Sequence, residues 1–438
     1  MGARETALNV LIACRKEDAW SNGILKAYIG RDRLDRRDAA LAARLSYGVL
    51  QNRTKLDFYL KQLLRGRLKD LHPAVRDILH LGLYQLYETD KIPDSAAVNE
   101  SVSLAKKYCP KVASAPGLVN GVLRNAIRSR DSLLQPETLW EKYSHPQGLV
   151  SLFRAYVGEE KLEPMLRANN SAPKTYAQVN TLKISQDALK AQLEQEGATA
   201  EIHPWVENCL ILGETGNLEK LPSFQQGLFY IQDPAARLSV LCAQISGEPV
   251  KILDCCAAPG GKSFAAAIAS GGKAKLISCD IHPHKAELIG KGAARLGLSG
   301  ITPMVQDASM PVPEWIGKMD LVIADVPCSG YGIIRKKPDI REKKPDTMKE
   351  LPLLQLEILQ NQAAYVKPGG VLMYSTCTLV RRENEGVVEK FLKQNPEFNL
   401  EKLNLPEIFP KNETGMLTLV PGQYDTDGFF ICRLRRKL

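Results

Sequence analysis

The chain has 438 residues, 44% of them hydrophobic, and a formal net charge of +9 at pH 7. This length is sufficient for two or three domains with buried cores. No apolar run reaches the ~18 residues of a membrane-spanning helix, and the charged start excludes the apolar core of a signal peptide, so a cytoplasmic protein is expected. The ten cysteines show no paired C-x-x-C spacing, which argues against a disulfide framework and a zinc site. We expect reduced thiols and no bound metal.

The positive charge is concentrated at the front of the chain. Residues 1–130 contain 23 Lys and Arg against 13 Asp and Glu, whereas the remainder contains 35 against 36. A basic front domain joined to a nearly neutral remainder suits an enzyme that acts on a phosphate polymer. A basic surface that serves only solubility is the alternative.

Residues 1–130 have apolar residues at helical spacing throughout, which predicts an all-α bundle. Asp94 or Ser95 is expected to cap one of its helices. The stretches IPDSAAVNESVSLAKKY and GLVNGVLRNAIR resemble the NusB-like RNA-binding domain. That resemblance makes Arg124 and Arg128, near one helix face, candidates for contacts with RNA phosphates; a solvated helix surface is the alternative.

Residues 131–245 read as linker helices followed by a small α+β subdomain. Strands are expected at 175–182, 210–212 and 227–231, with a helix at 186–196.

The stretch Lys251–Ser263 reads KILDCCAAPGGKS, a short apolar strand, a glycine-rich turn and the start of a helix. A ligand can lie against the backbone at such a helix N-terminus, because glycines permit close approach. A phosphate-binding P-loop requires Gly where Cys256 stands, and the dinucleotide fingerprint G-x-G-x-x-G is absent. The stretch resembles the CAAPGGK loop of S-adenosylmethionine-dependent RNA cytosine-C5 methyltransferases. This resemblance implies a cofactor-binding set of Cys256, Ala257, Ala258, Pro259, Gly260, Gly261 and Lys262.

Residues 246–438 alternate strands and helices, which predicts an α/β Rossmann-like methyltransferase domain with a mostly parallel, doubly wound sheet. After the strand at 251–256, further strands are expected at 275–279, 301–306, 321–324 and 370–375, and a closing antiparallel hairpin at 418–420 and 429–433.

Ligands of such sheets bind outside the carboxyl ends of the strands, where three aspartates are expected. Asp280 is placed to accept both hydroxyls of a ribose. Asp307 can accept from an adenine amino group or the adjacent main chain. Asp325 is placed to hold the ammonium of the methyl donor or the target base.

Methylation of cytosine carbon 5 requires a thiolate that first adds to carbon 6, and two cysteines are candidates. Cys328 lies in DVPCSGYG and Cys377 in YSTCT, at the ends of two strands expected to be neighbours. In the RNA enzymes that the chain resembles, the cysteine corresponding to Cys377 attacks and that corresponding to Cys328 helps release the product. A DNA cytosine methyltransferase would use Cys328 instead. A free thiol has a pKa of ~8.5, so Lys262 is expected to favour the thiolate or to position the base.

The stretch GIIRKKPDI follows the Pro-Cys motif and also matches this family. Arg335, Lys336 and Lys337 are therefore expected to hold phosphates near a flipped-out nucleotide. The nearby Arg341, Lys343 and Lys344 are interpreted as a solvated run. Gln178 stands where the family usually has Arg, so the resemblance does not supply the RNA contact expected there.

The resemblance covers essentially the whole chain, as a NusB-like domain at 1–130, a linker and small α+β subdomain at 131–245, and a methyltransferase domain at 246–438. It resembles the branch of the Sun-type RNA methyltransferases that modifies 16S ribosomal RNA, which implies S-adenosyl-L-methionine as cofactor, small-subunit ribosomal RNA as partner and a monomer. The alternatives are action on another RNA such as tRNA, a DNA cytosine methyltransferase, a P-loop NTPase, and a non-catalytic RNA-binding or antitermination factor.

Overall fold

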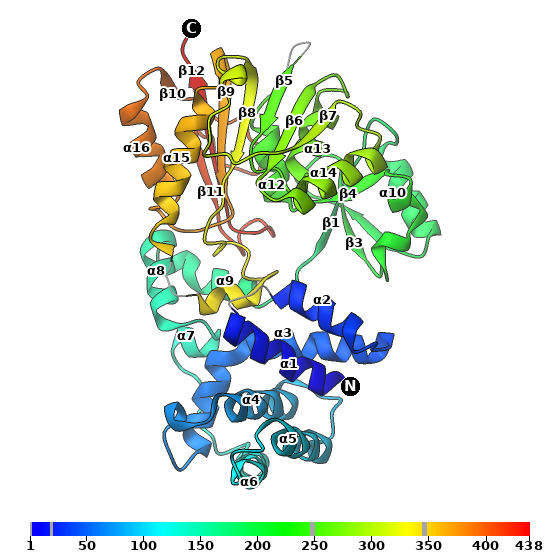
Figure 1. Cartoon of the computed structure of the whole chain (residues 1–438), viewed down its shortest axis with the longest axis vertical. Coiled ribbons are helices and arrows are strands. Elements are labelled where there is room, and N and C mark those ends of the chain that lie inside the picture. The colour runs from blue at the N-terminus through cyan, green and yellow to red at the C-terminus, as the bar shows by residue number, and fades with distance from the viewer. Residues whose placement is uncertain (1, 18–20, 246–249, 344–347) are drawn as a thin grey trace. The chain divides into compact units, whose positions relative to one another are not determined.

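The computed structural model describes residues 2–17, 21–245, 250–343 and 348–438, and these form two compact units. Met1–Ala155 and Ile334–Lys343 make up the first, called here the helical unit. Tyr156–Ile333 and Lys344–Leu438 make up the second, called the sheet unit. Figure 1 shows the helices of the one and the sheets of the other. The domain boundaries expected near 130 and 245 stay predictions.

The helical unit is the expected all-α bundle. Its core is built from apolar side chains of several helices, with α4 buried along most of its length. The helices are α1 (Ala3–Glu17), α2 (Ser21–Arg31), α3 (Arg36–Leu63), α4 (Pro73–Glu88), α5 (Asp94–Tyr108), α6 (Ala115–Arg128), α7 (Leu139–Lys142) and the start of α8 (Gln147–Val157).

The capping prediction for α5 is wrong. The helix begins at Asp94 itself, so Pro93 occupies the N-cap position, and a proline side chain cannot accept a hydrogen bond. The Asp94 carboxylate instead accepts a hydrogen bond from Arg130 at 2.9 Å. Asp94 therefore connects two segments of the helical unit.

A short segment from far along the chain completes the helical unit. It contains the 3-10 helix η4 (Pro338–Glu342), in which Ile340 is fully buried. Arg341 is only 1% exposed, and its guanidinium donates to the backbone oxygens of Gln51 at 2.6 Å and Ser144 at 2.9 Å. The interpretation of Arg341 as a solvated residue is therefore wrong, because its guanidinium is buried and donates to these backbone carbonyls. Lys344 lies outside the described residues.

Within the sheet unit, a small antiparallel sheet precedes the main one. Its strand order is β2-β3-β1-β4, and α10 (Gln186–Gln195) covers it, with Ser185 accepting a hydrogen bond from the Ala188 backbone at 3.3 Å as the N-cap. β2 was not expected from the sequence. The strands are β1 (Thr175–Val179), β2 (Thr199–Ile202), β3 (Cys209–Gly213) and β4 (Phe229–Ile231).

The main sheet has the order β10-β12-β9-β8-β5-β6-β7, with β11 paired to β12. The pairs joining β9, β8, β5, β6 and β7 are parallel, whereas β12 pairs antiparallel with β9, β10 and β11. The expected parallel sheet and closing hairpin are thus confirmed. The strands are β5 (Lys251–Asp254), β6 (Lys275–Asp280), β7 (Ile301–Val305), β8 (Met319–Asp325), β9 (Val366–Thr376), β10 (Phe398–Leu400), β11 (Met416–Leu419) and β12 (Phe429–Arg436).

Helices cover both faces of this sheet, as alternating side chains on the strands require (Figure 1). Ile252 and Ile323 point to one hydrophobic cluster, and their neighbours Leu253 and Val322 point to the other. The first cluster includes α12 (Pro234–Leu241), α13 (Gly261–Ala269) and α14 (Pro283–Leu296); the second includes α15 (Leu351–Ala363) and α16 (Glu385–Gln394). The sheet unit also contains α9 (Glu159–Asn169) and α11 (Pro222–Gln225).

Candidate active site

The glycine-rich loop joins β5 to α13 at the point where the strand order of the sheet reverses. Strands β6 and β7 lie on one side of β5, and β8 and β9 on the other, so this is the topological switch point at which α/β sheets bind ligands. Gly260 has φ 112°, and a Cβ there would lie 2.3 Å from the Phe264 ring. Only glycine therefore allows the chain to turn into α13, whose N-terminus has no side-chain cap.

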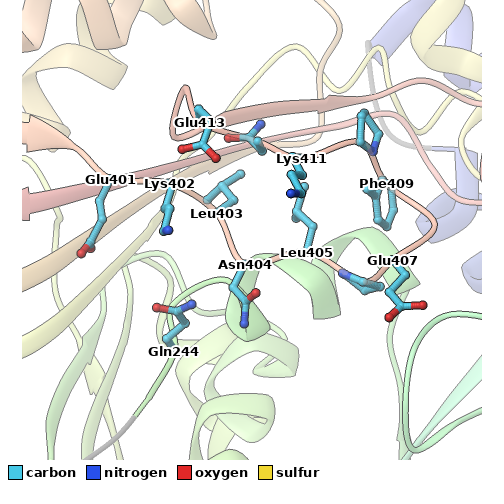
Figure 2. A pocket seen from close by; sticks show the side chains of 13 residues that line it. Gln244, Glu401, Lys402, Leu403, Asn404, Leu405, Glu407, Phe409, Lys411 and Glu413 are labelled. Atoms are coloured by element: carbon cyan, nitrogen blue, oxygen red, sulfur yellow. The ribbon is translucent and has the colours of Figure 1, made fainter.

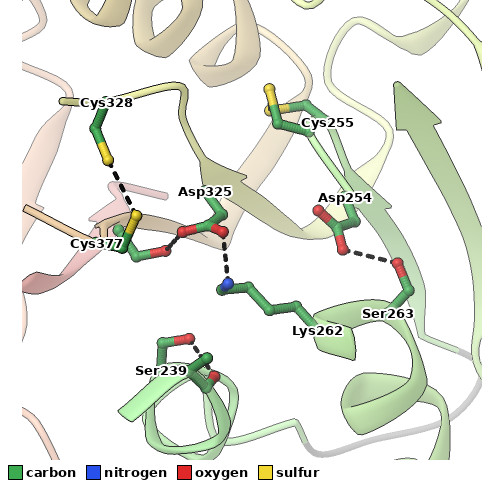
Figure 3. Close-up of polar contacts among 11 residues, drawn as sticks. Ser239, Asp254, Cys255, Lys262, Ser263, Asp325, Cys328 and Cys377 are labelled. Atoms are coloured by element: carbon green, nitrogen blue, oxygen red, sulfur yellow. Dashed lines mark hydrogen bonds and ion pairs between the residues drawn. The ribbon is translucent and has the colours of Figure 1, made fainter. Parts of the chain in front are cut away.

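The buried carboxylate of Asp254 stabilises the glycine-rich loop. Asp254 accepts a hydrogen bond from the Ser263 hydroxyl at 2.7 Å (Figure 3). The Ser278 hydroxyl in turn donates to that of Ser263 at 2.8 Å. Burial raises the pKa of Asp254 to about 7, although the Ser263 hydrogen bond and the nearby Lys262 charge oppose this. These three buried polar side chains thereby connect the end of β5, the start of α13 and β6.

Asp280 and Asp307 follow the neighbouring strands as expected. Asp280 ends β6, is 8% exposed, and accepts from the His282 backbone at 3.0 Å. Asp307 lies two residues beyond β7 and accepts from the backbone and hydroxyl of Ser309 at 2.9 and 2.7 Å. Because β5, β6 and β7 are parallel, both carboxylates lie at the same edge of the sheet as the glycine-rich loop.

Lys262 and Asp325 form an ion pair at the centre of this edge. The Lys262 ammonium lies 2.5 Å from one Asp325 oxygen, and the Ser375 hydroxyl donates to the other at 2.8 Å (Figure 3). The side chains are 11% and 27% exposed. Burial alone would lower the pKa of Lys262, but the charge of Asp325 outweighs it and raises that pKa, so Lys262 stays charged. The ammonium also lies 5.2 Å from the centre of the Phe429 ring.

The two candidate cysteines face one another beside this ion pair. Their sulfur atoms lie 3.3 Å apart, at the ends of the neighbouring parallel strands β8 and β9 (Figure 3). The hydrogen bond with Cys377, burial, and the charges of Glu383 and Asp325 raise the pKa of Cys328 well above its usual value. Cys328 therefore retains its proton at neutral pH and can donate it in a hydrogen bond to Cys377.

Gly332 closes the turn that follows Cys328. Its N–H donates to the Cys377 carbonyl at 2.9 Å, and its own carbonyl accepts from Gly428 at 2.8 Å. A Cβ at Gly332 would lie 2.0 Å from the Gly428 oxygen. The three stretches DVPCSGYG, STC and DGF, which are far apart in the sequence, therefore meet through backbone groups.

Three polar residues at this edge were not predicted as site residues. Ser375 holds Asp325, while Glu383 and Gln355 are fully buried beside the Cys328 turn. The sequence signal for Ser375 is its place directly before Thr376-Cys377. Glu383 lies 6 residues after Cys377, but its contact with the other cysteine turn needs the tertiary structure.

The expected RNA-binding residues have different surroundings. Arg124 and Arg128 are exposed and four residues apart on α6, hence on one helix face. Arg335, Lys336 and Lys337 are partly buried and belong to the helical unit. Gln178 is 1% exposed and donates to the Gln232 backbone oxygen at 3.0 Å, so its amide is directed into the small subdomain.

A cavity of about 580 Å³ lies elsewhere in the sheet unit, lined by Gln244 and by residues of the loop 401–413 (Figure 2). None of the predicted site residues lines it. One lining residue, Glu401, forms ion pairs with Arg433 at 2.7 Å and Arg435 at 2.9 Å. We therefore interpret this cavity as separate from the site.

Among the residues that the structure describes, no group of three or more His, Cys, Asp or Glu is arranged to hold a metal ion. Within the same ranges, no helix is both long and apolar enough to cross a membrane.

The doubly wound sheet, its antiparallel closing strands, the glycine-rich loop and the facing thiols together define the sheet unit as a methyltransferase. Comparison with known proteins agrees. A family model described as 16S rRNA methyltransferase RsmB/F matches residues 244–435, one for the NusB family matches 1–128, and one for an RsmF/B-like ferredoxin-like domain matches 145–219.

The relatives extend this similarity over the full chain. The probable ribosomal RNA small subunit methyltransferase B of Bacillus subtilis (strain 168) is 38% identical over 99% of this chain and 98% of its own length. A protein of Synechocystis sp. with the same name is 32% identical over the full length of both chains. The crystal structure of PH0851 has the same fold, with a TM-score of 0.80 and 23% identity over 100% of this chain and 99% of that one. The chain belongs to the ribosomal RNA small subunit methyltransferase B family.

Proposed function

We propose that the protein methylates carbon 5 of a cytosine in 16S ribosomal RNA, with S-adenosyl-L-methionine as the methyl donor. The observation that carries this proposal is the contact of 3.3 Å between the Cys328 and Cys377 sulfurs, beside the Lys262–Asp325 ion pair. The substrate follows from the names of the relatives that match the whole chain. A cytoplasmic location and a monomeric state are part of the same proposal.

The residues at the switch point fit the proposed donor. Gly260 and the uncapped N-terminus of α13 leave backbone N–H groups for the carboxylate of the methionine moiety. Asp280 and Asp307 supply acceptors for the ribose and adenine, and the loop from Cys256 to Lys262 would enclose the rest. When bound, S-adenosyl-L-methionine supplies an electrophilic methyl group.

In the proposed reaction, Cys377 adds as a thiolate to carbon 6 of the cytosine, which makes carbon 5 nucleophilic. The match of the YSTCT stretch around Cys377 with the RNA cytosine-C5 methyltransferases supports this assignment. Asp325, which contacts Lys262 and Ser375, is proposed to accept a hydrogen bond from the target base. Arg335, Lys336, Lys337, Arg124 and Arg128 are proposed to contact the RNA backbone.

The test uses RNA that contains 5-fluorocytosine, which cannot lose a proton from carbon 5 and therefore traps the adduct. The protein is incubated with S-adenosyl-L-methionine and a 16S ribosomal RNA fragment, a tRNA transcript or a DNA duplex, each carrying the fluorinated base, and the products are separated on a denaturing gel. We expect an adduct with the 16S fragment that Cys377→Ala abolishes and Cys328→Ala retains.

Three other outcomes would each contradict one part of the proposal. Loss of the adduct only in Cys328→Ala would exchange the roles of the cysteines. An adduct formed preferentially with tRNA or DNA would change the substrate. The absence of an adduct with every nucleic acid would refute the covalent mechanism.

A further inference from the structure

Two buried side chains hold the backbone on both sides of Cys328. The Gln355 amide, on α15, donates to the Pro327 carbonyl at 2.9 Å and to a Glu383 carboxylate oxygen at 3.0 Å. The same Glu383 oxygen accepts from the Ser329 N–H at 2.9 Å. Glu383 and Gln355 are both fully buried. The peptide groups before and after Cys328 are therefore fixed by one pair of residues.

The turn that carries Cys377 is attached to the same place. The Ser329 hydroxyl contacts the Thr378 hydroxyl at 2.6 Å, so a hydrogen bond joins the residues that follow the two cysteines. The Tyr374 hydroxyl donates to the Glu383 carbonyl at 2.5 Å, and Asn384 donates to the Thr378 carbonyl at 3.0 Å. Glu383 thus lies at the junction of both turns, through its side chain and its backbone.

The Glu383 carboxylate is energetically unfavourable for a contact that has only a structural role. Glu383 is completely buried, and its second carboxylate oxygen has no hydrogen-bond partner among the residues that the structure describes. A buried charge with an unsatisfied oxygen costs free energy that a neutral side chain of the same shape would avoid. Its charge also contributes to the raised pKa of Cys328, after the hydrogen bond with Cys377 and burial. The carboxylate therefore favours the protonated form of Cys328.

We propose that Glu383, together with Gln355, is a positioning residue for product release, which keeps the Cys328 thiol directed at the Cys377 sulfur. The inference rests on the proposed covalent mechanism. In the release step, carbon 5 gives its proton to water, and the electron pair of that C–H bond forms the C5–C6 double bond. The bond between carbon 6 and the Cys377 sulfur breaks, and Cys377 leaves as a thiolate that accepts a hydrogen bond from the Cys328 thiol.

The test measures the adduct formed with ordinary, unfluorinated 16S ribosomal RNA and S-adenosyl-L-methionine. Gln355→Ala removes the amide that donates to Pro327 and Glu383, whereas Glu383→Gln removes the charge that strengthens the bond from Ser329. We expect both variants to slow release more than attack, so that the adduct at steady state rises about tenfold. The matched control is Gln360→Ala on the same helix, where an exposed amide bonds to Gln394 at 2.5 Å. This control should give the same amount of adduct as the unmodified protein.

The result can be separated from failure of the proposed function. If the unmodified protein does not trap fluorinated RNA, the covalent mechanism itself is wrong. If it does, and folded Glu383→Gln turns over more slowly without extra adduct, Glu383 has only a structural role and the inference is overturned. Because Glu383→Gln preserves the size of the side chain, it decides the matter even where Gln355→Ala does not fold, with folding checked by circular dichroism.

Discussion

Replacing Arg341 by Met tests whether the segment 334–343 is an integral part of the helical unit. The substitution retains most of the apolar stem and removes the donors to the Gln51 and Ser144 carbonyls. Each of these charge-assisted hydrogen bonds contributes about 1–3 kcal/mol, so the two together contribute about 2–6 kcal/mol.

Part of this loss is offset, because a buried guanidinium is itself unfavourable. Burial lowers the pKa of Arg341 to about 10, which reports the same desolvation. We therefore expect the lower half of the range, a net destabilisation of about 2–4 kcal/mol. A loss in the middle of this range increases the equilibrium constant for local opening about a hundredfold.

The assay is hydrogen–deuterium exchange of the full-length protein, read by mass spectrometry in peptides covering residues 47–55 and 334–343. Arg341→Met should accelerate exchange in both peptides together. The control Arg124→Met replaces an exposed arginine of the same unit and should change stability by less than about 0.5 kcal/mol. Unchanged exchange in both peptides of Arg341→Met would show that the segment does not contribute to the helical unit.

Two further predictions concern the sheet unit. Gly332→Ala places a Cβ 2.0 Å from the Gly428 oxygen and 2.8 Å from the Cys377 oxygen, so initial rates of methyl incorporation should fall about a hundredfold, as expected for a displacement near 1 Å. In the control Gly117→Ala, the added Cβ would face open space among the described residues, so the rate should not change. For Asp254, the pKa of about 7 means that the folded state binds a proton that the unfolded state releases above about pH 4. Stability should therefore fall as pH rises from about 4 to about 7, by at most about 1.4 kcal/mol per pH unit. Asp254→Asn should flatten this slope in urea unfolding measured across the range, and an identical slope in the variant would contradict the assignment.

The main sheet was predictable because its signals are local. Each parallel strand is a short apolar run that ends in a polar residue, and the order of such strands at the switch point follows from general rules for α/β sheets. The loop at Gly260 and the cysteines 328 and 377 were found by motif, and the structure brings their elements to one edge. The strand predicted over 175–182 ends earlier, at Val179, because Asn180 turns inward and donates to the Gly227 and Leu296 carbonyls.

What the sequence did not reveal depends on contacts between distant residues. Arg341 lies in a run of charged residues, and charge patterning predicts exposure for such runs. The distant carbonyls of Gln51 and Ser144, to which it donates, favour its burial instead. Glu383 lies close to Cys377 in the sequence, yet its contact with the peptide group of Ser329 joins residues 54 positions apart. No periodicity or composition reports such a contact.

The discontinuity of the helical unit has a consequence for the order in which the chain acquires its structure. Domains commonly fold one after another during synthesis, starting from the N-terminus. Here the last segment of the helical unit, Ile334–Lys343, is translated only after strands β5 to β8 of the sheet unit. The nascent helical bundle therefore lacks Ile340 and Arg341 until about three quarters of the chain has been made. The helical unit can therefore complete its interior only after these strands of the sheet unit have been translated. A protein truncated before residue 334 would have a helical bundle with part of its interior missing.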